Sequence, residues 1–364
     1  MWYRITGLPI LAYLLLATLC QVRAEPPTSE NSETTGPVRV LRLGKLVVEV
    51  MDPLDPQLYN RGVRFTPVAA VLRVSNARRP YLYAPDNHDP IQDHGGLAAE
   101  FDLCTVDTPD SDLPPGYREA AVGDGFVKIG VGVLKKKKSR YTLFQQCELM
   151  EPAVTVVTWT DTSATFRQTC RGVNGYAYEL AATVHLHGRD EVLVDWKLKN
   201  SGSKSFTTRH YTHNFFRLGD ADAGPGYVLR FPYDFTVKGL EAQQVKRGRE
   251  ICFEEAIPKW VNAVIPYPDS AKYSGPFSCE LRHAGNGQSI ECETLGPDGA
   301  SLARSGSRVA LLRTDIHARA AYISPEQFIA VSLAPGEDQS WRKRTAFRYS
   351  APDVPPSLPT PPAP

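Results

Sequence analysis

Arg209-His210-Tyr211-Thr212-His213-Asn214-Phe215-Phe216 decides the fold class, because this stretch has the residue types of a buried β-strand. Side chains alternate between the two faces of a strand, so Arg209, Tyr211 and His213 share one face while His210 points to the other. An imidazole beside an arginine and a tyrosine suits proton transfer, since the ordinary pKa of histidine, about 6.5, lies near neutral pH. A core histidine with satisfied hydrogen bonds is the alternative interpretation.

Alternating apolar residues continue on the N-terminal side of this stretch. Every second residue from Tyr176 to Leu186 is apolar, and the segment from Glu191 to Lys199 repeats the pattern. Further strand-like runs cover residues 38–50, 63–74, 126–134, 141–147, 154–159 and 164–170, and a short helical window covers residues 240–245. We therefore predict an all-β chain of many antiparallel strands, arranged as a sandwich or a barrel.

Both ends of the chain differ in composition from its interior. Arg4, the apolar run Ile5 to Leu19 and Val22-Arg23-Ala24 predict a signal peptide over residues 1–24, so we expect a secreted or periplasmic protein. The apolar run is shorter than the roughly 20 residues that cross a bilayer, and we expect no membrane span. Residues 25–37 are polar and residues 350–364 are rich in proline, which predicts a disordered linker and tail around a single domain, 38–349.

Charge and cysteine content restrict the class of protein. The chain has 41 basic and 40 acidic residues, which gives no support for nucleic-acid binding. Six cysteines remain after the predicted signal peptide, and an oxidising compartment would favour disulfides. Two pairs flank predicted hairpins and are our candidates for disulfides: Cys147 with Cys170, and Cys279 with Cys292.

The motifs of several enzyme classes are absent from the sequence. It has no Gly-x-Ser-x-Gly elbow, no His-Glu-x-x-His, no phosphate-binding loop of the Walker type and no Gly-x-Gly-x-x-Gly turn. We therefore expect no metal and no cofactor. Two polar segments remain as candidates for chemistry: residues 86–96, which lead into Glu100, and Ser324 to Phe328, where Pro325 interrupts an apolar run next to Glu326.

Several short motifs, in order, resemble the galactose mutarotase-like superfamily of aldose 1-epimerases over roughly Asn60 to Tyr349. His213-Asn-Phe-Phe is similar to the family's His-x-Tyr-Phe strand, whose histidine protonates the ring oxygen of the sugar. Ile323-Ser-Pro-Glu326, followed by Leu333-Ala-Pro-Gly-Glu337, is similar to the strand that carries the catalytic glutamate. The resemblance implies a large antiparallel supersandwich, in agreement with the strand pattern.

The upstream motifs allow two alignments. His94-Gly95-Gly96 resembles the His-Gly-Gly of galactose mutarotases, but by position it also matches the Arg-Gly-Gly of hexose-phosphate epimerases. In the second alignment, Asp124-Gly-Phe-Val-Lys128 stands where those enzymes have His-Gly-Phe-Ala-Arg, so both ionisable positions differ. These two differences leave open an unusual sugar substrate or a changed reaction.

We therefore expect an exported monomer that interconverts the anomers of a sugar, and the resemblance implies Glu326 as the base and His213 as the acid. His94 would share the ring-oxygen side. The substrate-binding candidates are Arg209, Lys128, Asp124, Glu100 and Tyr211. One alternative is a carbohydrate-binding protein that kept the fold and lost the reaction. Another is a polysaccharide lyase-like enzyme with Tyr211 and Arg209 as its working pair.

Overall fold

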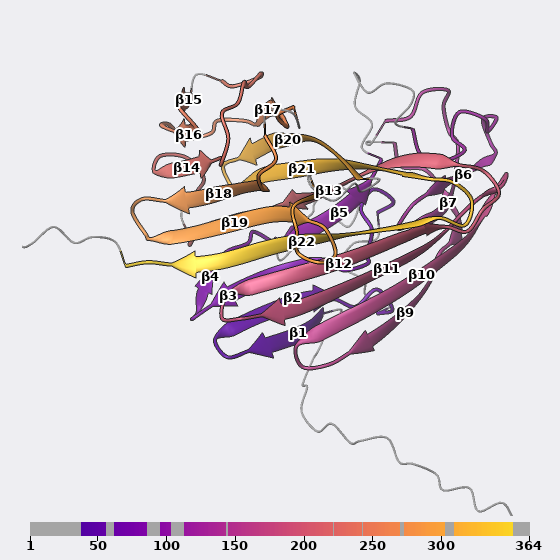
Figure 1. The fold of residues 1–364 in the computed structure, drawn as a ribbon, viewed down its shortest axis with the longest axis horizontal. Coiled ribbons are helices and arrows are strands. Elements are labelled where there is room, and N and C mark those ends of the chain that lie inside the picture. Colours follow the sequence, from indigo (N-terminus) through magenta and orange to yellow (C-terminus); the bar gives the residue numbers. More distant parts are fainter. Residues whose placement is uncertain are drawn as a thin grey trace, which may run out of the picture. The chain divides into compact units, whose positions relative to one another are not determined.

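A computed structural model describes residues 38–55, 62–85, 95–102, 113–142, 145–220, 222–241, 243–269, 273–302 and 309–351. These residues form three antiparallel β-sheets and contain no α-helix (Figure 1). The predicted signal peptide, the predicted linker and residues 352–364 of the predicted tail lie outside the described residues. No helix in the described part of the chain is long and apolar enough to cross a membrane.

A nine-stranded sheet carries the strand with the two histidines. Strand β4 (Arg79–Pro80) pairs with β3 at its side. The other strands follow in spatial order: β1 (Val38–Leu43), β2 (Leu46–Met51), β3 (Val71–Asn76), β5 (Leu97–Phe101), β13 (Phe206–Asn214), β21 (Tyr322–Leu333), β20 (Val309–Arg319) and β17 (Val261–Pro266).

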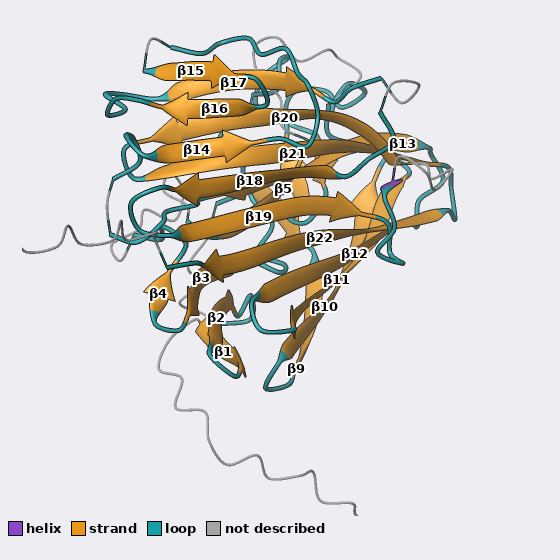
Figure 2. Cartoon of the chain, turned by 60° about the vertical axis from the view of Figure 1, so that its left-hand side comes forward, coloured by secondary structure: helices purple, strands orange, loops and turns teal. Residues whose placement is uncertain are grey.

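A ten-stranded sheet packs against it, and Figure 2 shows its strands running side by side. Their spatial order is β15 (Gln244–Arg247), β16 (Glu250–Phe253), β14 (Tyr227–Arg230), β18 (Phe277–His283), β19 (Gln288–Leu295), β22 (Asp338–Tyr349), β12 (Glu191–Asn200), β11 (Tyr176–His187), β10 (Ser163–Val173) and β9 (Val154–Trp159). A small third sheet contains β6 (Gly125–Lys128), β7 (Gly132–Lys135) and β8 (Leu149–Pro152).

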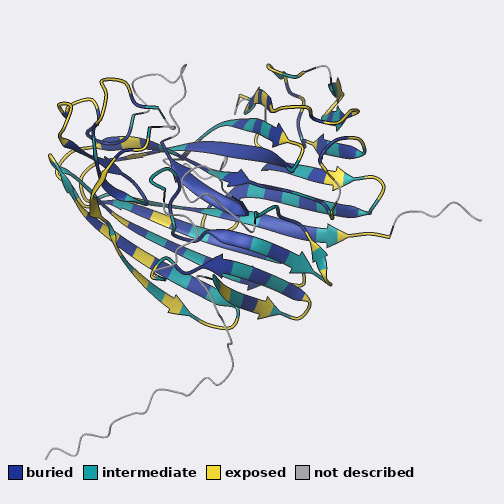
Figure 3. Cartoon of the chain, turned by 180° about the vertical axis from the view of Figure 1, so that it is seen from behind, coloured by how far each residue is buried: buried dark blue, intermediate teal, exposed yellow. Residues whose placement is uncertain are grey.

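The hydrophobic core lies between the two large sheets. Alternate residues of β11, such as Tyr178 and Val184, are buried there as the sequence pattern predicts, and Figure 3 shows the same alternation along neighbouring strands. Phe101 of β5 meets Trp196 of β12 edge to face, with ring centroids 6.2 Å apart. The shared core confirms an all-β sandwich of large antiparallel sheets.

Three local predictions were wrong. The window 240–245 is not helical: residues 240 and 241 are irregular and β15 begins at Gln244. Val245 pairs with Cys252 of β16 instead, because so short a window cannot stabilise a helix by itself. Only residues 71–74 of the run 63–74 are in a strand, and the described part of 141–147 has no strand; their apolar residues, among them Phe65 and Tyr141, pack from loops.

The five described cysteines are free thiols. Cys279 and Cys292 do face each other across the β18–β19 hairpin, with their sulfur atoms 3.3 Å apart, which is longer than a disulfide bond of about 2.05 Å. Cys147 and Cys170 are buried separately, in the core cluster around the third sheet and in the main core. Neither predicted disulfide is present, and Cys104 lies outside the described residues.

Candidate functional site

The two histidines of β13 have opposite environments, as the strand alternation predicts. His210 is completely buried between the large sheets, where the indole N–H of Trp341 donates to its Nδ1 atom at 3.2 Å. Phe101 and Trp196 pack around the same ring. Burial holds the pKa of His210 well below its usual range, and the nearby Lys343 adds to this effect. His210 is therefore a core residue.

His213 lies on the other face of the sheet and contacts Glu326. The Nε2 atom of His213 is 3.3 Å from Oε1 of Glu326, and the two residues are only 6% and 4% exposed. Phe215 stacks on the imidazole with ring centroids 4.1 Å apart, while Phe65 and Tyr322 contact its edges. The structure thus brings together the two residues that the sequence motifs assign to catalysis.

The backbone pairing between β13 and β21 is interrupted beside this pair. The ladder ends where His210 faces Ile329 and resumes in the same register where Phe216 faces Ile323. Pro325 lies in the gap and has no N–H to donate. Its carbonyl instead accepts a bond of 2.6 Å from the Asn214 side chain. Because the register is kept across the gap, side chains from the two strands still meet in opposing pairs.

Burial and the neighbouring Asp315 favour the neutral form of Glu326, whereas Arg64 and Ser324 favour its charged form. The Ser324 hydroxyl donates to its Oε1 atom at 3.0 Å, and Asp315 faces it directly across β20 and β21. Burial raises the pKa of Glu326 well above its ordinary value, and the carboxylate of Asp315 raises it further, while Arg64 opposes both effects. Arg313 pairs with Asp315 at 2.7 Å. A raised carboxyl pKa is typical of a group that exchanges protons near neutral pH.

A second cluster, which we call the Glu100 cluster, contains Arg64, Glu100, Lys128 and Tyr211. Glu100 is completely buried; Arg64 Nε donates to it at 2.8 Å and the Tyr211 hydroxyl donates to the same oxygen. Arg64 Nη2 also donates to the Tyr211 oxygen at 3.1 Å. Burial acts to lower the pKa of Arg64, but Glu100 and Tyr211 raise it above its usual range. Burial also raises the pKa of Tyr211 well above 10.0.

The remaining predicted site residues lie in different places. Lys128 is completely buried beneath Glu100 and donates to the carbonyl groups of Phe101 and Asp102, so its ammonium group faces the protein interior. Asp124 is exposed in the turn before β6. Arg209 shares the face of His213, and its charge acts on Asp315. His94 lies outside the described residues.

The two glycines after His94 allow β5 to lie against its neighbours. A Cβ atom on Gly95 would come within 2.6 Å of the Ala84 backbone, and one on Gly96 within 1.9 Å of the Val71 carbonyl oxygen. Gly96 also has a φ angle of 74°, which glycine adopts without strain. Its carbonyl accepts from the Phe215 N–H at 2.9 Å, so the glycine pair sets the position of the ring that stacks on His213.

Three residues of the site were missed from the sequence: Arg64, Asp315 and His317. His317 Nδ1 is 2.6 Å from the Asn262 side-chain oxygen, and burial is the main cause that lowers its pKa to about 4. A signal was available for two of them, because Asp315 and His317 alternate with the buried Ile316 on β20. Nothing in the sequence indicates that Arg64, in a loop, reaches Glu100.

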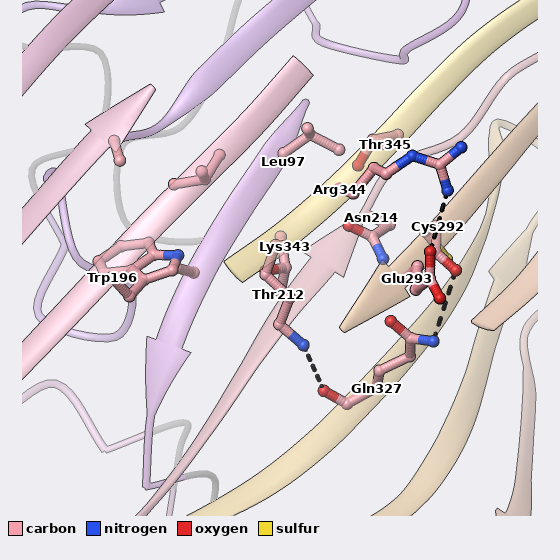
Figure 4. A pocket seen from close by; sticks show the side chains of 13 residues that line it. Leu97, Trp196, Thr212, Asn214, Cys292, Glu293, Gln327, Lys343, Arg344 and Thr345 are labelled. Atoms are coloured by element: carbon pink, nitrogen blue, oxygen red, sulfur yellow. Dashed lines mark hydrogen bonds and ion pairs between the residues drawn. The ribbon is translucent and has the colours of Figure 1, made fainter. Parts of the chain in front are cut away.

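An internal cavity lies behind the site, on the core side of β13 and β21 (Figure 4). Its volume is about 20 Å³, enough for about one water molecule. Thr212, Asn214, Gln327 and Lys343 are among its lining residues. A larger hollow of about 210 Å³ is lined by Ala181 and other residues of β11, β12 and β22. Neither space is lined by His213 or Glu326.

No protein-family profile and no curated protein matches the sequence. Solved structures do match the fold. A protein of Synechocystis sp. PCC 6803 is 11% identical with a TM-score of 0.53, covering 88% of this chain and 100% of its own. A putative aldose 1-epimerase of Escherichia coli is 15% identical with a TM-score of 0.50, covering 86% and 99%.

A galactose mutarotase-like protein of Clostridium acetobutylicum is 10% identical with a TM-score of 0.51, covering 85% of this chain and 95% of its own. Identities this low speak for the fold alone, because one fold hosts many functions. They agree with the fold expected from the short motifs on β13 and β21. The chain therefore has the galactose mutarotase-like fold that those motifs imply.

Proposed function

We propose that this protein is an exported aldose 1-epimerase that interconverts the anomers of a free sugar. The observation that carries the proposal is the 3.3 Å separation between His213 Nε2 and Glu326 Oε1. The ring oxygen and the anomeric hydroxyl of a sugar are bonded to the same carbon, so the acid and the base that act on them must be neighbours. Two adjacent strands supply such a pair here.

In the proposed reaction, Glu326 as carboxylate removes the proton of the anomeric hydroxyl while His213 as imidazolium protonates the ring oxygen. The bond between the anomeric carbon and the ring oxygen breaks, and an open-chain aldehyde forms. Rotation about the neighbouring carbon–carbon bond presents the other face of the carbonyl, and closure by the reverse proton transfers gives the other anomer. The pair gains one proton and gives one away, so no other reactant is required.

The surroundings support this division of roles. The high pKa of Glu326 makes its carboxylate a stronger base than an exposed glutamate, while burial strengthens its interaction with His213. A bound sugar would take the place of the direct contact between these two side chains. Arg64, the partly exposed member of the Glu100 cluster, and Arg209, on the same face as His213, offer donors for the remaining hydroxyl groups.

The alternatives receive less support. A lyase would need Tyr211 as a base, but its hydroxyl donates to Glu100 and burial raises its pKa well above 10.0. A carbohydrate-binding protein without activity is favoured by the low exposure of His213 and Glu326, at 6% and 4%. This second candidate predicts sugar binding that leaves the rate of anomer exchange unchanged.

One experiment separates the three candidates. Purified protein is added to freshly dissolved α-anomers of common hexoses and uronic acids, and anomer exchange is followed by NMR. Faster exchange supports the epimerase, whereas binding without acceleration supports the carbohydrate-binding protein. A parallel incubation with a uronate polymer, followed by ultraviolet absorbance, detects the unsaturated product of a lyase.

A further inference from the structure

A buried lysine reaches the catalytic strand from the core side. Lys343 lies on β22, in the ten-stranded sheet, and its side chain points between the sheets. Its Nζ atom donates to the main-chain carbonyl of Gln327 at 2.9 Å (Figure 4). It also donates to the Thr294 hydroxyl at 2.8 Å. Both acceptors are neutral oxygens. Burial of an ammonium group with neutral partners is costly, and here it lowers the pKa of Lys343 to about 7.

Gln327, which accepts from this lysine, directly follows Glu326 in the chain. Its side chain points to the core while that of Glu326 points to the site. The Gln327 amide nitrogen donates to the Phe277 carbonyl at 2.6 Å, and its amide oxygen accepts from Thr294 at 2.9 Å. The side chain and the carbonyl of Gln327 are thus held by β18, β19 and β22, strands of the opposite sheet.

The interrupted ladder explains why these contacts matter. In the kept register, the Gln327 carbonyl would accept from the N–H of Thr212, but the β13–β21 ladder is broken at this position. Lys343 supplies the donor in its place. The small cavity beside Thr212 and Asn214 also leaves this part of β21 with less packing on its core side than a filled core would give. The segment that carries Glu326 therefore depends on side-chain hydrogen bonds for its position.

We propose that Lys343 is a positioning residue for Glu326: its bond to the Gln327 carbonyl fixes β21 through the break in the sheet and sets the distance between Glu326 and His213. The catalytic role of Glu326 in this statement rests on the function proposed above. The positioning itself is a property of the folded chain and can be measured without a substrate. Lys343 touches no substrate, and its effect passes through Gln327.

The test compares Lys343→Met with Lys136→Met. Lys136 is a matched control, because it is also a buried lysine and its Nζ atom donates to two main-chain carbonyls, those of Tyr117 and Ala120. It lies directly after β7 of the third sheet, and its Nζ atom also lies over the Tyr117 ring. Circular dichroism melting of both variants shows that they fold and how far each is destabilised.

Two readouts follow the consequences for Glu326. The first is kcat and KM for anomer exchange on the sugar that the wild type accelerates. The second is the titration midpoint of the Glu326 carboxyl carbon, measured by NMR on protein with labelled glutamate and assigned with Glu326→Gln. We expect Lys343→Met to lower kcat by about tenfold or more, with little change in KM, and to move the Glu326 midpoint. Lys136→Met should do neither.

Equal values for the two variants in both readouts would overturn the proposal. If the wild type accelerates no sugar, the proposed function fails, and the Glu326 midpoint alone then decides whether Lys343 positions it. If Lys343→Met does not fold, Thr294→Val replaces it, since this change removes one acceptor of Lys343 and the donor to Gln327. A Glu326 midpoint in Thr294→Val equal to that of Lys136→Met would then count against the proposal.

Discussion

Asp315 faces Glu326 directly across β20 and β21, so two carboxyl groups lie side by side on the same face of the sheet. Arg313 pairs with Asp315 at 2.7 Å and compensates the negative charge of its carboxylate. Glu326 accepts from the Ser324 hydroxyl at 3.0 Å and contacts Nε2 of His213 at 3.3 Å. Burial, and then the charge of Asp315, raise the pKa of Glu326.

The first prediction concerns the pH dependence of activity. Glu326 must lose its proton to act as a base, so the rate should decrease at pH values below the pKa of Glu326. Asp315→Asn removes a cause that raises this pKa, and the acidic limb of kcat/KM should move to lower pH by about one unit. Asp195→Asn is the control, since Asp195 also pairs with an arginine, Arg342, but lies on β12. An unmoved acidic limb in Asp315→Asn would show that Glu326 is not the titrating base.

The second prediction separates stability from activity in the Glu100 cluster. Tyr211→Phe removes a hydroxyl that donates to Glu100 and accepts from Arg64, and should cost about 1 to 2 kcal/mol of unfolding free energy. Tyr178→Phe removes a hydroxyl with two partners in the core, Gln168 and Gly130, at a similar cost. Urea unfolding measures both. Only Tyr211→Phe should raise KM for a sugar; equal KM values would remove Tyr211 from the substrate-binding residues.

The third prediction concerns the glycine pair before β5. Gly96→Ala places a methyl group 1.9 Å from the Val71 carbonyl oxygen in addition to the strain of a positive φ angle, and should cost about 3 kcal/mol or more. Gly44→Ala has a φ angle of 61° but meets nothing within 4 Å, so it should cost only about 1 kcal/mol. Denaturant unfolding distinguishes them. Equal losses would mean that close packing at Gly96 does not fix β5.

The fourth prediction is a pH dependence of stability that arises at Asp102. Burial raises the pKa of Asp102 from 3.8 to about 7, although Lys128 opposes the effect. The folded state therefore binds this proton more tightly than the unfolded state, so the stability that Asp102 contributes is complete below pH 3.8 and is lost as the pH rises toward 7.

Asp102→Asn removes this penalty and keeps an acceptor for the Thr208 hydroxyl, which now donates to Asp102 at 2.7 Å. The unfolding free energy of the variant, measured relative to wild type, should increase as the pH rises from 4 to 8, by at most about 4 kcal/mol. Denaturant unfolding at pH 4 and at pH 8 measures this increase in unfolding free energy, with Asp195→Asn as a comparison. A difference between Asp102→Asn and wild type that does not change with pH would contradict the assignment.

The fold class and the pairing of His213 with Glu326 could be predicted from the sequence because they depend on strand alternation and short motifs. The period of two along β13 separates His210 from His213, and the short motifs on β13 and β21 carry His213 and Glu326. Which histidine is the core residue could not be decided from period alone. That choice depends on Trp196 of β12 and Trp341 of β22, two strands of the opposite sheet, which pack on one face only.

The rest of the site depends on contacts between distant segments. Arg64 reaches Glu100 from a loop 36 residues earlier, and Lys343 reaches Gln327 across the two sheets. A charged side chain such as that of Lys128 is expected from the sequence at the surface or in the site. Its partners, Glu100 and two main-chain carbonyl groups, nevertheless allow its burial. Sequence spacing contains no information on such pairs, because the fold alone brings them together.

The central claim is that His213 and Glu326 act together as acid and base on a sugar. The most direct test is the NMR rate of anomer exchange for wild type, Glu326→Gln, His213→Gln and the double variant, with Lys136→Met as the folded control. The account predicts acceleration by wild type and control, a loss of about 10²- to 10⁴-fold in each single variant, and little further loss in the double variant. Single variants that exchange anomers as fast as the wild type would contradict it.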